Sequence, residues 1–473
     1  MHVFLLRRLL RLLVFLLLFL LLAFAGNWIF VRPDTFAVLT LQDLRHTPDA
    51  ELVFVGSSVV RNHINPEILR EETGKRAINA GIPCLSLPGA IALTEDLYRS
   101  CRPETVVLVL EPSLFGADEE DIEAENILMP YLRGMDTRLR YYRTLVQQDH
   151  RYLDRLFLYR TFSIRSVTEI FRTLTMHFCP QRIDPAPISQ KDRAGHYEKS
   201  GFVRFSTEPC PGKVLRQAFR REPVVSDYSI RPETVSLLKQ YRDLTRMHGS
   251  RLLILLFPNI SAAYLSSPGI LGYSLSLERF CAEENIPFIN FGMAGPDLLP
   301  SLDPYYYDPY HFGGDGVDLF SHALGRCLRL LSEGQDISPL FYPDKWSFLL
   351  SLNPLPNVWI DRYEGQWNYS WEQAPEDLPE LREDQVLFLA NANHLPGATP
   401  LYAFAAVSSD GSESFLTEYR PNGILVLNRS DVPAHLRVYA RLQDNPGLPP
   451  VSNDFPESSD HLFFGGIREQ TVN

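Results

Sequence analysis

From Glu51 onward, short apolar segments alternate with longer segments of helical periodicity. Five apolar segments have the length of strands: residues 51–55, 76–81, 105–110, 251–257 and 286–290. Several are continuous apolar runs, which is typical of parallel strands covered by helices on both faces. Residues 231–249 and 314–331 carry the clearest helical patterns. The alternation predicts an α/β domain with a doubly wound, five-stranded parallel sheet of the flavodoxin-like type.

Two further regions follow a different pattern. Residues 116–230 separate the third and fourth predicted strands by far more than one crossover needs, so we expect a helical insertion that borders the site. After a linker at 336–356, short β-like segments with a hairpin signal at Asp410-Gly411 predict an antiparallel β-sandwich over residues 357–445. Residues 446–473 are rich in Pro, Asp and Ser, and we expect a flexible tail there.

The first 31 residues form a separate segment. Arg7, Arg8 and Arg11 precede an almost uninterrupted apolar run, Leu12 to Val31, and about 20 apolar residues span a bilayer. The positive-inside rule then predicts a cytoplasmic stub and a transmembrane anchor over residues 1–31. The alternative is a cleaved signal peptide, with a small-x-small site at residues 23–25. Apolar residues continue past that site, which favours the anchor, and both interpretations place the body outside the cytoplasm.

Composition narrows the class of protein. The chain has 473 residues, enough for two or three domains, and its 45% hydrophobic content excludes a disordered protein. The net charge is −12 and no basic patch stands out, which argues against nucleic acid as a partner. Six cysteines show no C-x-x-C spacing, which excludes zinc sites of that kind. Cys179 and Cys210 could pair outside the cytoplasm or remain free thiols.

The candidate chemistry begins where the first strand ends. Ser57 and Ser58 follow that strand and open a helix, and ligands of doubly wound sheets lie at the carboxyl ends of strands. A serine there can act as a nucleophile beside backbone N–H groups that hold an oxyanion, or it can simply cap the helix. Asp308 and His311 lie after the last strand and before the last helix, so they reach the same edge of the sheet.

Ser, His and Asp are the residue types that acyl transfer needs. We therefore expect Ser58 as the nucleophile, His311 as the general base and Asp308 as the residue that orients the imidazole. A loop whose Asp and His merely cap a helix remains an alternative. A metal site built from Asp303, Asp308, His311 and Asp315 lacks the tight spacing of familiar ligand sets, so no metal or other cofactor is expected.

These motifs resemble the SGNH (GDSL-like) hydrolase superfamily over about residues 45–335. Gly56-Ser57-Ser58 resembles its Gly-x-Ser block, Asn79-Ala80-Gly81 its second block, and Asp308-Pro309-Tyr310-His311 its final Asp-x-x-His block. Together with the N-terminal segment, the chain is similar to the membrane-anchored, acyltransferase-like branch. That branch includes the D-alanyl transfer protein of teichoic acid and the alginate O-acetyltransferases.

The resemblance implies roles for further residues. The Ser58 and Gly81 N–H groups would form part of the oxyanion hole. The third block departs from the family pattern Gly-x-Asn-Asp, because this chain has Glu111-Pro112-Ser113 and Ser113 occupies the position of the oxyanion-hole asparagine. The loss of one such donor raises the barrier by about 3 kcal/mol, which weakens the expectation of efficient hydrolysis.

The expected function is a membrane-anchored, extracytoplasmic serine acyltransferase or esterase. Its substrate would be O-acyl, most often O-acetyl, groups of a surface or secreted polysaccharide, and a membrane-embedded partner protein would supply acyl groups. Arg61 and Tyr310 are candidate substrate-binding residues. A plain SGNH esterase or deacetylase and a non-catalytic surface-assembly protein remain alternatives. We expect His63 to face solvent, with a place at the rim of the site as the alternative. The tryptophans 359, 367 and 371 are expected to lie in the sandwich core or to form a carbohydrate platform.

Overall fold

The structure is a computed structural model of the chain. It describes most of the central domain and most of the C-terminal strands. The described residues are 2–30, 35–111, 128–148, 167–178, 195–205, 229–266, 268–352, 355, 357–363, 379–394, 398–444 and 450–455.

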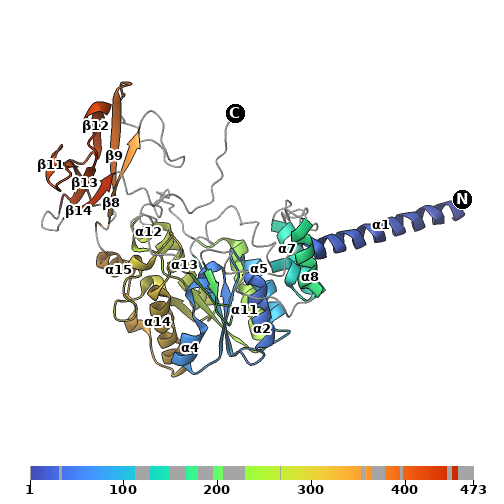
Figure 1. Ribbon diagram of the computed structural model, residues 1–473. Coiled ribbons are helices and arrows are strands. Elements are labelled where there is room, and N and C mark those ends of the chain that lie inside the picture. The colour runs from blue at the N-terminus through green and yellow to red at the C-terminus, as the bar shows by residue number, and fades with distance from the viewer. Residues whose placement is uncertain are drawn as a thin grey trace.

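A five-stranded parallel sheet forms the centre of the molecule (Figure 1). Its strands follow the order β2-β1-β3-β6-β7, which is the flavodoxin-like order. Their bounds are β1 Leu52–Gly56, β2 Ala77–Gly81, β3 Thr105–Leu110, β6 Arg251–Leu256 and β7 Phe288–Asn290. All five strands were predicted from the apolar pattern, to within two residues at each end. The parallel sheet is therefore confirmed.

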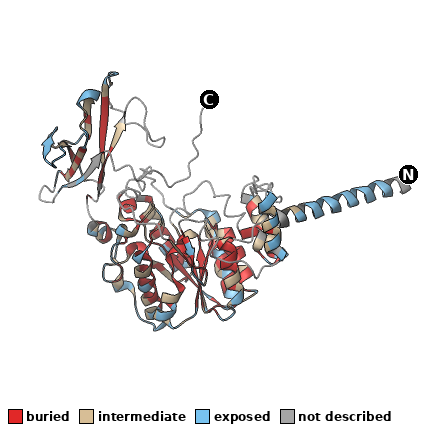
Figure 2. Cartoon of the chain, viewed as in Figure 1, coloured by how far each residue is buried: buried red, intermediate tan, exposed pale blue. Residues whose placement is uncertain are grey.

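Helices cover both faces of this sheet, because its strands are apolar on both sides (Figure 2). Val53 and Val55 of β1 pack into one apolar cluster, and Phe54 between them packs into the other. The first cluster is covered by α2 Phe36–His46, α5 Leu87–Leu97, α11 Pro232–Met247 and α13 Pro268–Glu283. The second is covered by α3 Ser58–His63, α4 Pro66–Thr73, α12 Ser261–Ser266 and α14 Asp315–Ser332.

The region between β3 and β6 contains both helices and a hairpin. Its described helices are η2 Met129–Tyr131, α7 Met135–Gln148 and α8 Val167–Phe178, which agrees with the helical pattern of its first half. Residues 116–230 were expected to form a helical insertion, but they also include the antiparallel hairpin β4 Gly195–Tyr197 and β5 Val203–Phe205. Cys179 and Cys210 lie outside the described residues, so their pairing stays a prediction.

The C-terminal region contains two antiparallel sheets. One has the order β12-β9-β8 and the other β11-β10-β13-β14, and their facing side chains share one apolar cluster. The bounds are β8 Asn357–Tyr363, β9 Gln385–Asn393, β10 Pro400–Val407, β11 Glu413–Phe415, β12 Ile424–Asn428, β13 Leu436–Leu442 and β14 Val451–Phe455. β14 lies within residues 446–473, where a flexible tail was expected. It joins the sheet by main-chain pairing with β13, which its polar sequence does not reveal.

Trp359 connects this region to the central domain. The short helix α15 Lys345–Ser351 precedes β8. The Trp359 side chain of β8 is buried, yet it belongs to the apolar cluster of β1, α3 and α14 and not to the cluster between the two sheets. It is therefore neither a sandwich-core residue nor an exposed platform. Trp367 and Trp371 lie outside the described residues.

The N-terminal helix α1 His2–Phe30 extends away from the body and contacts α8 (Figure 1). Leucine, valine and phenylalanine side chains between Leu6 and Leu22 are exposed on it. Among the helices whose residues the structure describes, none combines the length and the apolar character needed to cross a membrane. The anchor therefore stays a prediction.

Candidate active site

Ser58 is the first residue of α3, directly after β1. The turn between them is tight, since a Cβ on Gly56 would lie 2.8 Å from the Val109 carbonyl oxygen. Ser57 is the N-cap of α3, and its hydroxyl accepts the Val59 N–H at 3.3 Å. The strand and the cap thus deliver Ser58 to the carboxyl edge of the sheet, where parallel sheets bind ligands.

Ser58, His311 and Asp308 form a continuous hydrogen-bonded chain. The Ser58 Oγ lies 2.8 Å from His311 Nε2, and His311 Nδ1 lies 2.9 Å from Asp308 Oδ2. Asp308 Oδ1 also accepts the backbone N–H groups of Tyr310 and His311, both at 2.8 Å. The Asp308 carboxylate is thereby fixed within its own loop, and it holds the imidazole with Nε2 directed at the serine. This is the order of contacts used in serine hydrolases.

Glu111 is a fourth polar residue at this edge, and it was not predicted as a site residue. It follows β3, and its carboxylate accepts a hydrogen bond from the Ser57 hydroxyl. Burial raises the pKa of the Glu111 carboxyl, while the Ser57 hydrogen bond and the charge of His311 act in the opposite direction. Its position directly after a buried strand, beside the strand that carries Ser58, was the available signal.

The expected oxyanion-hole role of Gly81 does not fit the structure. The Gly81 N–H donates to Asn79 Oδ1 at 3.0 Å, so it is already engaged. A Cβ on Gly81 would lie 2.2 Å from the Arg61 nitrogen. The glycine is therefore required by the close approach of α3. Ser113, the other expected oxyanion donor, lies outside the described residues.

Asn79 is a buried residue that holds α3 against β2. Its Nδ2 donates to the Val60 and Ile64 carbonyl oxygens at the end of α3. Its side chain thus adds a second hydrogen bond to the Val60 carbonyl, which also accepts the Ile64 N–H, and its Oδ1 accepts the Gly81 N–H. The second sequence block serves here to position the helix that carries Ser58.

The β4–β5 hairpin borders the site from the insertion side. The Asn79 N–H donates to the Ser200 carbonyl at 2.9 Å, which seats the hairpin turn on β2. The Tyr307 ring stacks with Phe205 of β5 and with His311, at centroid distances of 5.4 Å and 5.9 Å. Through Tyr307 the hairpin is therefore connected to the imidazole.

The two candidate substrate-binding residues have different surroundings. Tyr310 lies on the loop beside His311 and is 56% exposed. The Arg61 guanidinium lies 5.7 Å from the centre of the Phe36 ring, and its Nε donates to Asn62 Oδ1. Tyr310 thus presents its ring next to the base, whereas Arg61 packs against α2.

Two other features are separate from the triad. Among the described residues, no group of three or more His, Cys, Asp or Glu side chains could hold a metal ion. Asp303 instead accepts the Ser261 N–H at the start of α12.

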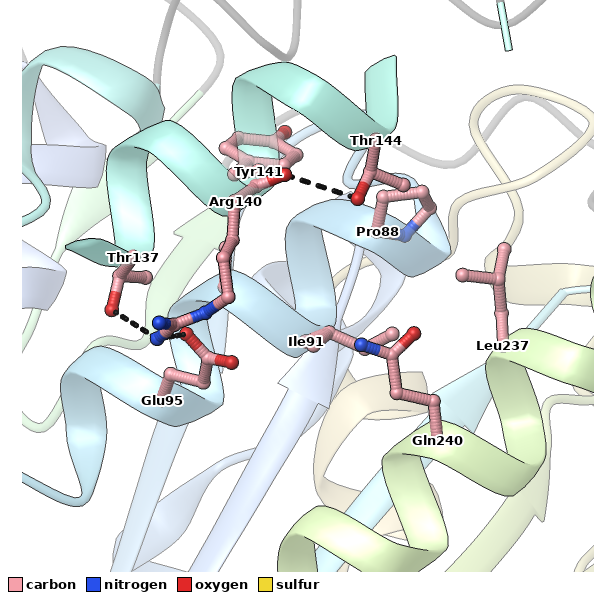
Figure 3. Close-up of a pocket in the computed structure, with 10 residues that line it drawn as sticks. Pro88, Ile91, Glu95, Thr137, Arg140, Tyr141, Thr144, Leu237 and Gln240 are labelled. Carbon is pink, nitrogen blue, oxygen red and sulfur yellow. Dashed lines mark hydrogen bonds and ion pairs between the residues drawn. The ribbon is translucent and has the colours of Figure 1, made fainter. Parts of the chain in front are cut away.

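A small hollow of about 30 Å³ lies between α5, α7 and α11, lined by Glu95, Arg140 and Gln240 among others (Figure 3). Ligand pockets are about ten times larger or more, so we assign it no ligand.

No protein-family model and no curated protein matches the chain. Among solved structures, the chain is similar to a presumed acylhydrolase from Bacteroides fragilis, with 10% sequence identity and a TM-score of 0.29. That similarity covers 61% of this chain and 94% of the other chain. Similarity at this level assigns neither a family nor an activity, so a proposal about function depends on the geometry of Ser58, His311 and Asp308.

Proposed function

We propose that the protein is a serine acyltransferase or esterase that works through Ser58, His311 and Asp308. The observation that carries the proposal is the 2.8 Å contact between Ser58 Oγ and His311 Nε2, with Asp308 on the other ring nitrogen. A serine hydroxyl is a weak nucleophile on its own. An imidazole that is oriented by a carboxylate supplies the base that it needs.

The proposed reaction has two halves. The Ser58 Oγ bonds to the acyl carbonyl carbon, and its proton passes to His311 Nε2. The bond to the leaving oxygen then breaks, that oxygen takes the proton, and an acyl-serine ester remains. Water or a sugar hydroxyl attacks this ester and gives its proton to His311, and Ser58 Oγ recovers the proton as it leaves. The Asp308 carboxylate stabilises the imidazolium in both halves, and the Ser58 N–H faces the developing oxyanion.

The substrate class and the location are also proposals. We propose O-acyl groups of a surface or secreted polysaccharide, because the exposed Tyr310 ring beside His311 suits stacking on a sugar. The arginines before the apolar run of α1 support a single-pass anchor in the cell membrane with the catalytic domain outside the cytoplasm. A membrane-embedded partner would supply the acyl group of a transferase.

A non-catalytic surface-assembly protein is the second candidate. It is favoured by two departures from the expected site: the Gly81 N–H is engaged with Asn79, and Glu111 and Ser113 stand in the third block. A plain esterase differs from the transferase only in its acceptor, so a comparison of water with a sugar hydroxyl as acceptor distinguishes them.

Labelling with a fluorophosphonate tests the proposal. In this reaction Ser58 Oγ bonds to phosphorus, fluoride leaves, and the serine proton passes to His311. The full-length protein in detergent should be labelled, and peptide mass spectrometry should locate the label on Ser58. Ser57→Ala is the matched serine control and should still be labelled, whereas Ser58→Ala should not. Equal labelling of Ser58→Ala and the wild type would contradict the proposed function.

A further inference from the structure

Helix α3 contacts the catalytic loop at both of its ends. Its first residue, Ser58, lies 2.8 Å from His311 Nε2. Its last residue, His63, accepts the backbone N–H of Phe312 at its Nε2, at 3.1 Å. Phe312 directly follows His311. One short helix thus makes the proposed nucleophile–base contact at one end and binds the backbone next to the base at the other.

His63 is completely buried, at 0% exposed, so the expectation that it faces solvent was wrong. Its ring stacks on Phe312 at 4.0 Å and on Phe257, which follows β6, at 5.0 Å. Its ring centre lies 5.4 Å from that of His311, and the two ring planes are inclined by 61°. Aromatic packing of this kind needs no imidazole, so the feature that distinguishes His63 from a phenylalanine here is its hydrogen-bond acceptor.

The second ring nitrogen supports this view. Because Nε2 accepts the hydrogen bond of the Phe312 N–H, the neutral ring carries its own hydrogen on Nδ1. That Nδ1 is buried and has no hydrogen-bond partner among the described residues. A buried donor without a partner is unfavourable for folding. Packing does not explain why an imidazole occupies this position, whereas the bond to the Phe312 N–H does.

We propose that His63 is a positioning residue that holds the backbone after His311 and so keeps His311 Nε2 within reach of Ser58. The inference rests on the proposed function of Ser58 and His311. Loss of the acceptor would release the Phe312 N–H and loosen the loop, without removing any group that touches the substrate.

The acceptor persists only while His63 is neutral. Burial lowers the pKa of His63 well below its ordinary value, and the nearby charge of His311 lowers it further. Two other elements pack against His63. Phe257, which is uncharged, contacts its ring, and the Ser321 hydroxyl of α14 donates to its backbone carbonyl. Asp308 and Glu111 face His311 at the same edge of the sheet. The lowered pKa of His63 means that its ring should stay neutral and keep its acceptor at neutral pH.

The test compares His63→Gln with His63→Phe in the full-length protein. The oxygen of the Gln amide reaches the position of Nε2 and keeps an acceptor, whereas Phe keeps only the ring. The readout is the rate at which Ser58 reacts with a fluorophosphonate, with thermal unfolding measured alongside. We expect His63→Phe to react about 10- to 100-fold more slowly at neutral pH, and His63→Gln to stay within about threefold of the wild type.

Rescue by Gln is the readout that a purely structural role would not give, because Gln restores the acceptor but not the aromatic ring. If His63→Phe does not fold, the rate in folded His63→Gln still tests the inference, since a rate about 10-fold or more below the wild type would contradict it.

Three outcomes would overturn the inference. These are a wild-type rate in folded His63→Phe, a rate in His63→Gln as low as in His63→Phe, and a rate in folded His63→Gln that is about 10-fold or more below the wild type. In each of them, loss of labelling in Ser58→Ala would leave the proposed function intact. If Ser58→Ala is labelled like the wild type, the proposed function itself fails.

Discussion

Ser57 and Ser58 are neighbours in the sequence and have different partners. The Ser57 hydroxyl accepts the Val59 N–H and donates to Glu111, so Ser57 is the helix cap. The Ser58 hydroxyl contacts His311. The sequence left open whether a serine here caps the helix or acts as a nucleophile. In the structure Ser57 caps the helix, and Ser58 is free of that role and contacts His311.

Substitutions in the triad should be unequal in effect. Ser58→Ala and His311→Ala should lower turnover of an acetyl ester by a similar factor, about 10⁵- to 10⁶-fold, because the two residues act as a unit. Asp308→Asn should lower this turnover by about 10⁴-fold, since Asp308 only orients and stabilises the imidazole. Steady-state kinetics of the three variants check the order. A smaller loss in His311→Ala than in Asp308→Asn would contradict the assigned roles.

Glu111→Gln should change stability in a pH-dependent way. Burial raises the pKa of Glu111, so the folded state holds this proton more tightly than the unfolded state. Stability is therefore lost as pH rises from the unfolded pKa through the folded pKa. Gln keeps an acceptor for the Ser57 hydroxyl and carries no charge. Glu111→Gln should thus unfold at higher temperature than the wild type at neutral pH, and show no such gain below the unfolded pKa of about 4.3.

The matched control is Glu71→Gln on the exposed surface of α4. It should shift the midpoint of thermal unfolding little at either pH. A gain for Glu111→Gln that is the same in acid and at neutral pH would show that charge burial is not the cause.

The sequence places some site residues and misses others for a physical reason. Ser58, Asp308 and His311 could be placed because strand ends and turn residues are local signals. The burial of His63 depends on Phe257 and Phe312, which are distant in sequence. The engagement of Gly81 depends on the direction of the Asn79 side chain, which no periodicity reveals.

The secondary-structure elements also divide into those that the sequence reveals and those that it does not. The strands of the central sheet lie in largely apolar segments, so the sequence alone reveals them. The β4–β5 hairpin and β14 are short or polar. They are held by main-chain pairing with strands that cannot be identified as their partners from the sequence. The hairpin nevertheless reaches the site through Phe205 and Tyr307.

Gly201→Ala should disturb the site through this hairpin. Gly201 has φ +82°, and a Cβ there would lie 1.7 Å from the Asn79 carbonyl oxygen. The hairpin must therefore move off β2. Gly249→Ala is the control, because Gly249 has φ +77° with nothing within 4 Å. Both variants should lose about 1 kcal/mol or more from the left-handed backbone. Only Gly201→Ala should also slow the labelling of Ser58, and equal rates in the two variants would exclude a role for the hairpin.

For the whole molecule, the orientation of α1 is the main prediction. A reporter enzyme fused after residue 335 should be active only outside the cytoplasm, because the arginines precede the apolar run. N-terminal sequencing of the mature protein should show that residues 1–25 are retained. A mature chain that begins at Gly26 would replace the anchor with a cleaved signal peptide.

The contact between Ser58 and His311 joins positions 253 residues apart. At about 5 to 20 residues per second, the ribosome completes His311 about 10 to 50 seconds after Ser58. During that interval the strand and helix that carry the serine exist without a base. A chain that is truncated or degraded before the last helix of the central domain then has an ordinary serine hydroxyl. Under the proposed function, Ser58 would therefore become reactive only after the loop that carries His311 has been made and has folded against α3.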